Sequence, residues 1–128
     1  MGSAVPTVSD AELDVMKVLW SGGPGTVREV ETRLNKRRRR WAYNTVLTLL
    51  SRLREKGFVH ADKSGAAHVF KAAVSREQLL RRGLMALADR VCDGTASPLL
   101  HALVEGGQLT AKDIAELRRM LDQMESNE

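Results

Sequence analysis

Residues 36–57, KRRRRWAYNTVLTLLSRLREKG, decide the fold of this chain, because they join a run of basic residues to the pattern of an amphipathic helix. Four apolar side chains recur at the spacing of one helix face, which is therefore expected to lie against a core. They are Val46, Leu49, Leu50 and Leu53. The other side carries short or hydrogen-bonding groups, namely Asn44, Thr48, Ser51, Arg52 and Glu55. The pattern predicts a helix that packs on one face and presents the other to a groove.

The positive charge of the chain is concentrated in the same stretch. The formal charge is +4, but residues 1–72 hold 13 Lys and Arg against 7 Asp and Glu, whereas residues 73–128 hold 7 against 9. Residues 36–56 alone hold 8 bases and 1 acid. A local basic patch favours a polyanionic partner, because phosphate contacts release counterions and dominate affinity. A basic run can also be a solvated face, so the charge by itself leaves both interpretations open.

Composition favours a mainly helical protein in a reducing compartment. Hydrophobic residues make up 43% of the chain, enough for a core, but aromatic residues make up 4%, so packing must rely on aliphatic side chains. The single cysteine, Cys92, excludes an intramolecular disulfide and is expected to be a small buried apolar side chain. The sequence has neither an apolar run of about 18 residues nor a signal-peptide pattern. A cytoplasmic protein is expected, with residues 1–8 as a disordered leader.

Three helices and a hairpin are expected over residues 9–73. The first two helices are predicted to start at Ser9 and Thr26, each followed three residues later by a Glu that can complete a capping box. A third helix covers residues 43–56. The β-preferring residues after it favour two strands around a turn at 62–65. This order of elements predicts a winged helix-turn-helix domain.

Residues 74–128 are expected to form a three-helix dimerisation domain. Helix starts are marked at Ser75, Ser97 and Thr110. The segment holds more apolar side chains than it can bury by itself, so burial against a second copy is the economical solution. Packing back on the N-terminal domain within a monomer is the alternative. The side chains expected in the dimer interface are Leu84, Leu87, Val91, Leu100, Leu103, Ile114, Leu117, Leu121 and Met124.

Catalytic chemistry finds little support in the sequence. The chain has no Gly-rich phosphate loop followed by Lys-Ser/Thr, no Gly-x-Ser-x-Gly turn and no His-Glu-x-x-His helix. His60 and His68 could approach each other across the wing, but no third metal ligand is evident. We therefore expect no enzymatic activity, no catalytic residue, no metal and no cofactor.

DNA binding is the interpretation that the residues favour. A helix-turn-helix protein places its recognition helix in the major groove of double-stranded DNA, with the N-terminal residues nearest the bases. Asn44 can pair with adenine, and Thr45, Leu47 and Thr48 can contact thymine methyl groups or flanking atoms. For Trp41, packing of the basic run on the domain is favoured over base stacking.

Contacts to the DNA backbone should position the protein rather than specify sequence. They are expected from Arg37, Arg38, Arg39, Arg40, Ser51, Arg52, Lys63 and His68. The alternative is a winged helix used as a protein-interaction module, without sequence-specific DNA binding. A strong dependence of affinity on salt would separate DNA binding from that alternative.

Three motifs in order resemble those of the penicillinase-repressor family of BlaI, MecI and CopY regulators. They are SDAELDVMKVLW at residues 9–20, WAYNTVLTLLSRLREKGFV at residues 41–59 and HVFKA at residues 68–72. The resemblance extends over almost the whole chain. It implies a homodimeric winged-helix repressor that binds a palindromic operator and dimerises through its C-terminal helices. It also implies that the base-reading residues are Tyr43, Asn44, Thr45, Leu47 and Thr48.

The family resemblance also bears on how repression is relieved. In the β-lactam-responsive members, a protease activated by a membrane sensor cuts an Asn-Phe bond in the dimerisation segment, to which Ala102-Leu103 corresponds here. The implied partner is a membrane sensor-protease or another protease. The copper-responsive members release DNA through a cysteine-rich C-terminal site, which Cys92 alone cannot form. The resemblance predicts repression relieved by a signal-dependent event such as proteolysis, without naming the signal.

Overall fold

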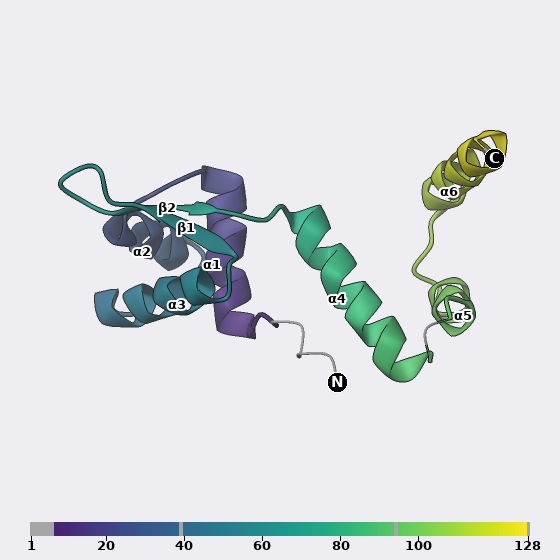
Figure 1. Ribbon diagram of the computed structural model, residues 1–128, viewed down its shortest axis with the longest axis horizontal. Helices are drawn as coiled ribbons and strands as arrows, with labels where there is room; N and C mark the ends of the chain where they lie inside the picture. Colours follow the sequence, from purple (N-terminus) through teal and green to yellow (C-terminus); the bar gives the residue numbers. More distant parts are fainter. Residues whose placement is uncertain (1–6, 39, 94, 128) are drawn as a thin grey trace. The chain divides into compact units, whose positions relative to one another are not determined.

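The computed structural model describes residues 7–38, 40–93 and 95–127. The part of the expected leader before Thr7, and Arg39 in the basic run, lie outside these residues. Six helices and one two-stranded sheet are present in the described part of the chain, in agreement with the expected mainly helical fold (Figure 1).

The chain divides into two compact units, residues 1–83 and residues 84–128. The division falls inside the fourth helix, α4 (Arg76–Val91), rather than at the expected boundary between residues 73 and 74. Val74 lies in the core of the first unit and Leu79 packs against it, so the chain remains part of the winged helix beyond the wing. The indole Nε1–H of Trp20 also donates to the carbonyl of Val74 at 2.9 Å.

The first unit is the expected winged helix-turn-helix. Its helices are α1 (Asp10–Gly22), α2 (Val27–Lys36) and α3 (Tyr43–Glu55). The wing is an antiparallel hairpin of β1 (Val59–Asp62) and β2 (Val69–Ala72), in which Val59 is opposite Ala72. Phe70 in β2 also exchanges two backbone hydrogen bonds with Gly25, which ties the wing to the turn between α1 and α2.

Four of the predicted helix starts, at Ser9, Thr26, Ser75 and Thr110, are confirmed by their hydrogen bonds. Ser9 caps α1 with Glu12 in a reciprocal capping box, and Thr26 and Glu29 do the same for α2. Two further pairs, Ser75 with Gln78 and Thr110 with Asp113, open α4 and α6 (Ala111–Ser126) in the same way. Each pair satisfies two backbone N–H groups that the helix leaves without an intrahelical acceptor. The helices α3 and α5 (Ser97–Glu105) differ, because Ala42 and Ala96 at their N-caps provide no side-chain cap, and Ser97 is the first residue of α5 rather than its cap.

The core of the first unit is built from the helix faces that the sequence periodicity predicts. The four apolar side chains of α3, Val46, Leu49, Leu50 and Leu53, are all buried. They lie in one cluster with residues of α1, α2 and the wing, which include Val15, Met16, Val30, Leu34, Phe58 and Phe70. Burial of one such side chain contributes about 1.5–3 kcal/mol. Together they fix which face of α3 is left on the surface.

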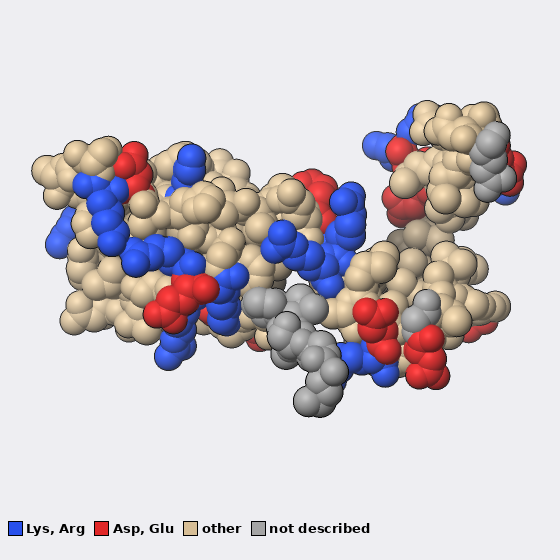
Figure 2. All heavy atoms as spheres, viewed as in Figure 1, with Lys and Arg blue, Asp and Glu red and all other residues tan. Residues whose placement is uncertain are grey.

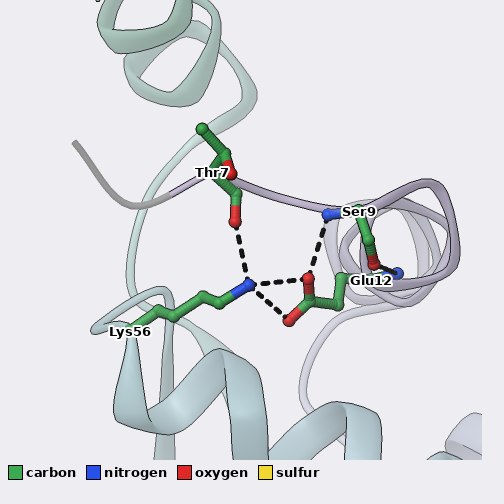
Figure 3. Close-up of polar contacts among 4 residues, drawn as sticks. All are labelled: Thr7, Ser9, Glu12 and Lys56. Atoms are coloured by element: carbon green, nitrogen blue, oxygen red, sulfur yellow. Dashed lines mark hydrogen bonds and ion pairs between the residues drawn. The ribbon is translucent and has the colours of Figure 1, made fainter. Parts of the chain in front are cut away.

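An ion pair that sequence reasoning did not foresee joins α1 to the end of α3. Lys56 Nζ lies 2.8 Å and 2.9 Å from the two carboxylate oxygens of Glu12, and 2.9 Å from the carbonyl oxygen of Thr7 (Figure 3). The Glu12 side chain is 3% exposed and that of Lys56 is 33% exposed. The same carboxylate accepts the backbone N–H of Ser9. Lys56, which belongs to the basic stretch by sequence, is therefore neutralised inside the fold.

The surroundings of Glu12 favour its charged form. Burial by itself would raise the pKa of the carboxyl group, but the hydrogen bonds from Lys56 and Ser9 and the charge of Lys56 together lower the pKa below its ordinary value of 4.5. A lowered pKa stabilises the folded state above the pKa of the unfolded chain, and this stabilisation is lost as the pH falls through the folded-state pKa. The pair is thus intact at neutral pH and fails in acid.

The second unit begins within α4 and contains α5 (Ser97–Glu105) and α6. Ala88 and Cys92 are buried, which confirms the expectation for the single cysteine. By contrast, neither α5 nor α6 has a buried residue. Among the described residues, no helix is long and apolar enough to cross a membrane.

Breaking the pair between Glu12 and Lys56 should destabilise the fold. We expect Glu12→Gln to cost about 1–3 kcal/mol at neutral pH, because it removes a buried charge-assisted hydrogen bond. Lys56→Met should cost at least as much at neutral pH, since it leaves a buried carboxylate unpaired, and this cost should shrink as the pH falls and Glu12 is protonated. Thermal unfolding followed by circular dichroism between pH 3 and 7 measures both.

Lys63→Met is the matched control, because it removes an exposed lysine from the wing and should change stability by less than about 0.5 kcal/mol. The double variant of Glu12 and Lys56 should lose less than the sum of the single losses. Additive losses, or a cost of Lys56→Met that is as large at pH 3 as at pH 7, would contradict the assigned interaction.

Candidate nucleic-acid interface

The exposed face of α3 gathers all the residues that were expected to read bases. Tyr43 and Leu47 are 40% and 38% exposed, which is unusual for large apolar or aromatic side chains and leaves them free for a partner. Asn44, Thr45 and Thr48 are exposed beside them. The opposite face is held in the core, so these five side chains share the surface of one helix.

The Thr48 hydroxyl is already engaged within α3. It donates to the backbone carbonyl of Asn44 at 2.9 Å. The proton of the hydroxyl is therefore used, and what remains for a partner is its lone pairs and the methyl group. These groups suit a base amino group and a thymine methyl group in the major groove.

Several of the expected backbone-contacting residues surround that face. Ser51 and Arg52 are exposed further along α3. Arg37, Arg38 and Arg40 are exposed in the connection from α2 to α3, where Arg38 adopts a positive φ of 66°. On the face seen in Figure 2, Lys and Arg side chains run in a band across the winged-helix unit.

The wing contributes Lys63 and His68, which are both exposed. The turn between its strands is shaped by Asp62, whose carboxylate accepts the backbone N–H of Ser64 at 2.9 Å. His68 lines the same groove as Tyr43 and Leu47 of α3. The structure therefore brings one wing residue next to the expected base readers, whereas Lys63 is not among the residues that line this groove.

Arg28 is a residue at this surface that sequence reasoning missed. It is exposed at the start of α2, and its guanidinium lies over the ring of Tyr43, 5.4 Å from the ring centroid. A cation over an aromatic face at this distance is attracted by the ring electrons. A possible sequence signal was a basic residue two positions after the predicted helix start at Thr26, but its proximity to Tyr43 depends on how α2 packs on α3.

Arg33, also on α2, has a structural role instead. Its guanidinium donates to the carbonyl oxygens of Gly23 at 2.6 Å and Pro24 at 3.2 Å. It therefore holds the turn that precedes Gly25, the residue that pairs with Phe70 of the wing. A Cβ atom on Gly25 would come within 3.2 Å of the same guanidinium, so a glycine fits this close approach.

Trp41 has the role that the sequence favoured. It is half-buried and packs against the hydrophobic core of the first unit. The large ring holds the chain directly after the basic run on the domain. The expected packing of this side chain on the domain is therefore confirmed.

The residues expected in a dimer interface lie in the second unit with much of their surface exposed. Leu84 is half-buried, whereas the others are exposed, from Leu117 at 38% to Val91 at 68%. Met85, Val104 and Met120 are exposed in the same unit and extend the expected set. Ala102 and Leu103, the residues of the implied cleavage bond, are exposed within α5.

Three packed helices, a hairpin wing and a third helix with a polar, exposed face define a winged-helix DNA-binding protein. Comparison with known proteins identifies it further: residues 8–123 match the penicillinase repressor family, and the chain belongs to that family. It is therefore a DNA-binding transcriptional repressor rather than an enzyme or a protein-interaction module.

The similarity to individual family members extends over most of the chain. The chain is 30% identical to the penicillinase repressor of Bacillus licheniformis over 119 residues, which are 93% of this chain and 92% of that protein. It is 37% identical to the transcriptional regulator BlaI of Mycobacterium tuberculosis over 122 residues, 93% of this chain and 86% of the relative. The solution structure of the DNA binding domain of the repressor BlaI has 35% identity and a TM-score of 0.51, and the match covers 61% of this chain and 93% of that domain.

Proposed function

We propose that the repressor acts as a homodimer in the cytoplasm, where it binds a palindromic operator with the exposed face of α3 in the major groove. The observation that carries this proposal is the division of α3 into a buried apolar face and an exposed face with the five expected base readers. A recognition helix needs both properties, because one face must be fixed while the other approaches base edges.

Within the proposed complex the side chains of α3 have different tasks. Asn44 pairs with an adenine, since its carboxamide can donate and accept at once. Thr45, Leu47 and Thr48 contact thymine methyl groups and flanking atoms, and Tyr43 borders the bases at the start of the helix. Together these contacts distinguish the operator from other DNA.

The basic and hydroxyl side chains of the protein that surround this face are proposed to contact phosphates of the DNA. Ser51 and Arg52 extend along α3, and the run of arginines from Arg37 to Arg40 follows α2. Lys63 and His68 approach from the wing. These contacts fix the register of the protein on the duplex and make affinity depend on salt.

Dimerisation is supported by the apolar surface of the second unit. On α6, the side chains of Ile114, Leu117, Leu121 and Met124 fall on one helix face and are all 38% exposed or more. Burial of such an apolar face away from water is favourable. A second copy of the same face can provide this burial when the two copies are related by two-fold symmetry. Two-fold symmetry in the protein in turn matches a palindromic operator.

Relief of repression is proposed to act on the same unit. Proteolysis between Ala102 and Leu103 would cut α5 among exposed apolar side chains of the proposed interface, such as Leu100. Because the bond lies inside a helix, cleavage requires α5 to open locally first. The proposed partner is a membrane sensor-protease or another protease that the signal activates.

The role of Asn44 is testable by comparing two DNA duplexes. Asn44→Ala should weaken binding to the operator by about 1–3 kcal/mol and leave binding to a random duplex nearly unchanged, because base contacts carry the specificity. The operator is obtained by selection from a random pool, and affinities are measured by fluorescence anisotropy. Gln123→Ala on α6 is the control, since it removes a carboxamide from the other unit. Equal losses on both duplexes would reject the base-reading role.

Dimerisation is testable by placing a charge on the apolar face of α6. Leu117→Asp or Leu121→Asp should convert the dimer to a monomer, because an unpaired carboxylate would be buried in the interface. Sedimentation velocity reads the change, and operator affinity should fall with it. Gln123→Asp, which adds the same charge on the opposite side of α6, should remain dimeric. A Leu117→Asp protein that sediments as the wild type does would refute the interface.

The proposed cleavage is testable in cells of the source organism after exposure to candidate inducers. Mass spectrometry of the repressor should then detect a fragment that ends at Ala102 and one that starts at Leu103. Derepression with an intact chain would rule out this route.

A further inference from the structure

A groove of about 680 Å³ lies between the start of α2, the start of α3 and the wing. Its lining includes Val27, Arg28, Tyr43, Leu47, His68 and Phe70. Two of the expected base readers, Tyr43 and Leu47, thus form one of its walls. A duplex that these side chains read would therefore lie beside the groove.

The charge of the groove favours an anion. Arg28 contributes a guanidinium that is always protonated at physiological pH, and its position is set by the ring of Tyr43, 5.4 Å away. His68 adds a ring N–H on the opposite, wing side. Among the described residues that line the groove, none carries a carboxylate.

The N-terminal end of α2 does not by itself create this preference for an anion. The N–H groups at its start are partly engaged by the capping box, in which Thr26 Oγ1 accepts the N–H of Glu29 and the Glu29 carboxylate accepts the N–H of Thr26. These hydrogen bonds lower the pKa of Glu29, so that its negative charge stays at the helix start. The negative charge of Glu29 offsets the attraction of the helix start for a phosphate, and Arg28 is the lining residue with a permanent positive charge.

The rest of the lining suits a sugar. Val27, Leu47 and Phe70 present apolar carbon to the groove, as do the two alanines of the wing, Ala66 and Ala67. A deoxyribose has a largely apolar face and is attached to a phosphate on either side. An apolar wall next to a guanidinium therefore matches a deoxyribose-phosphate unit better than it matches a free, fully hydrated anion.

We propose that this groove seats one strand of the DNA backbone between the segments read by α3 and by the wing, and that Arg28 binds its phosphate. This inference rests on the proposed placement of α3 in the major groove, and it adds a contact residue outside the set expected from the sequence. The Tyr43 ring orients the guanidinium before DNA arrives, which reduces the ordering needed on binding.

The test compares Arg28 variants of the full chain on the selected operator and on a random duplex of equal length. Anisotropy titrations at several salt concentrations between about 50 and 200 mM give the slope of log K against log salt, which is about −0.9 for each phosphate neutralised. Arg28→Gln should make the slope less negative by about 0.9 for each bound protomer. It should weaken binding about tenfold for each protomer on both duplexes, because a phosphate contact is independent of sequence.

Two variants control for charge and for stacking. Lys112→Gln removes one exposed positive charge from α6 and should leave the slope unchanged. Arg28→Lys keeps the charge but not the planar guanidinium, so it should keep the wild-type slope with a smaller loss of affinity. Circular dichroism should give the same thermal transition for Arg28→Gln as for the wild type, since Arg28 is exposed.

The outcomes separate this inference from the proposed function. An Arg28→Gln protein with the slope and affinity of Lys112→Gln would overturn the groove as a phosphate seat, while operator binding by the wild type would stand. A loss restricted to the operator, with the slope unchanged, would also overturn it, because it would make Arg28 a base-reading residue. Failure of the wild type to prefer its selected operator would instead refute the proposed function.

Discussion

The rotation of α3 about its own axis is fixed by the burial of Val46, Leu49, Leu50 and Leu53, and the recognition surface depends on this constraint. If α3 turned by one residue, about 100°, it would move apolar side chains into water and the proposed base readers into the core. Each buried side chain contributes about 1.5–3 kcal/mol, so the four together oppose such a rotation strongly. The polar contacts around α3 are weaker by comparison and refine a position that packing has already set.

Those refining contacts connect the two ends of the recognition helix to separate parts of the fold. At its C-terminal end, Lys56 binds Glu12 of α1 and the carbonyl of Thr7. At its N-terminal end, Tyr43 lies under Arg28 of α2. The wing is held independently, because Arg33 supports the turn in which Gly25 pairs with Phe70. The helix and the wing are thus positioned by different hydrogen bonds on one shared core.

The sequence was sufficient for the parts of this structure that depend on local spacing. Capping boxes at Ser9, Thr26 and Thr110 are four-residue patterns, and the apolar stripe of α3 repeats within two turns, so both could be predicted before any packing was known. The Glu12–Lys56 pair could not, because its members are 44 residues apart and Lys56 looks like one more base in a basic run. Arg28 was missed for the same reason: its distance from Tyr43 follows from packing of α2 on α3 and not from spacing.

The hydrogen bond from Thr48 to the Asn44 carbonyl has a consequence for the entropy of recognition. A free side chain at an interface loses rotamer freedom when it binds, at a cost of about 0.5–1.5 kcal/mol for a flexible one. Thr48 is restrained during folding, both by its branched Cβ and by this bond. Its methyl group and lone pairs therefore point in a set direction before any duplex is present. One element of the proposed reading surface is thus ordered in advance, and we propose that sequence discrimination at that position rests on shape rather than on induced adjustment.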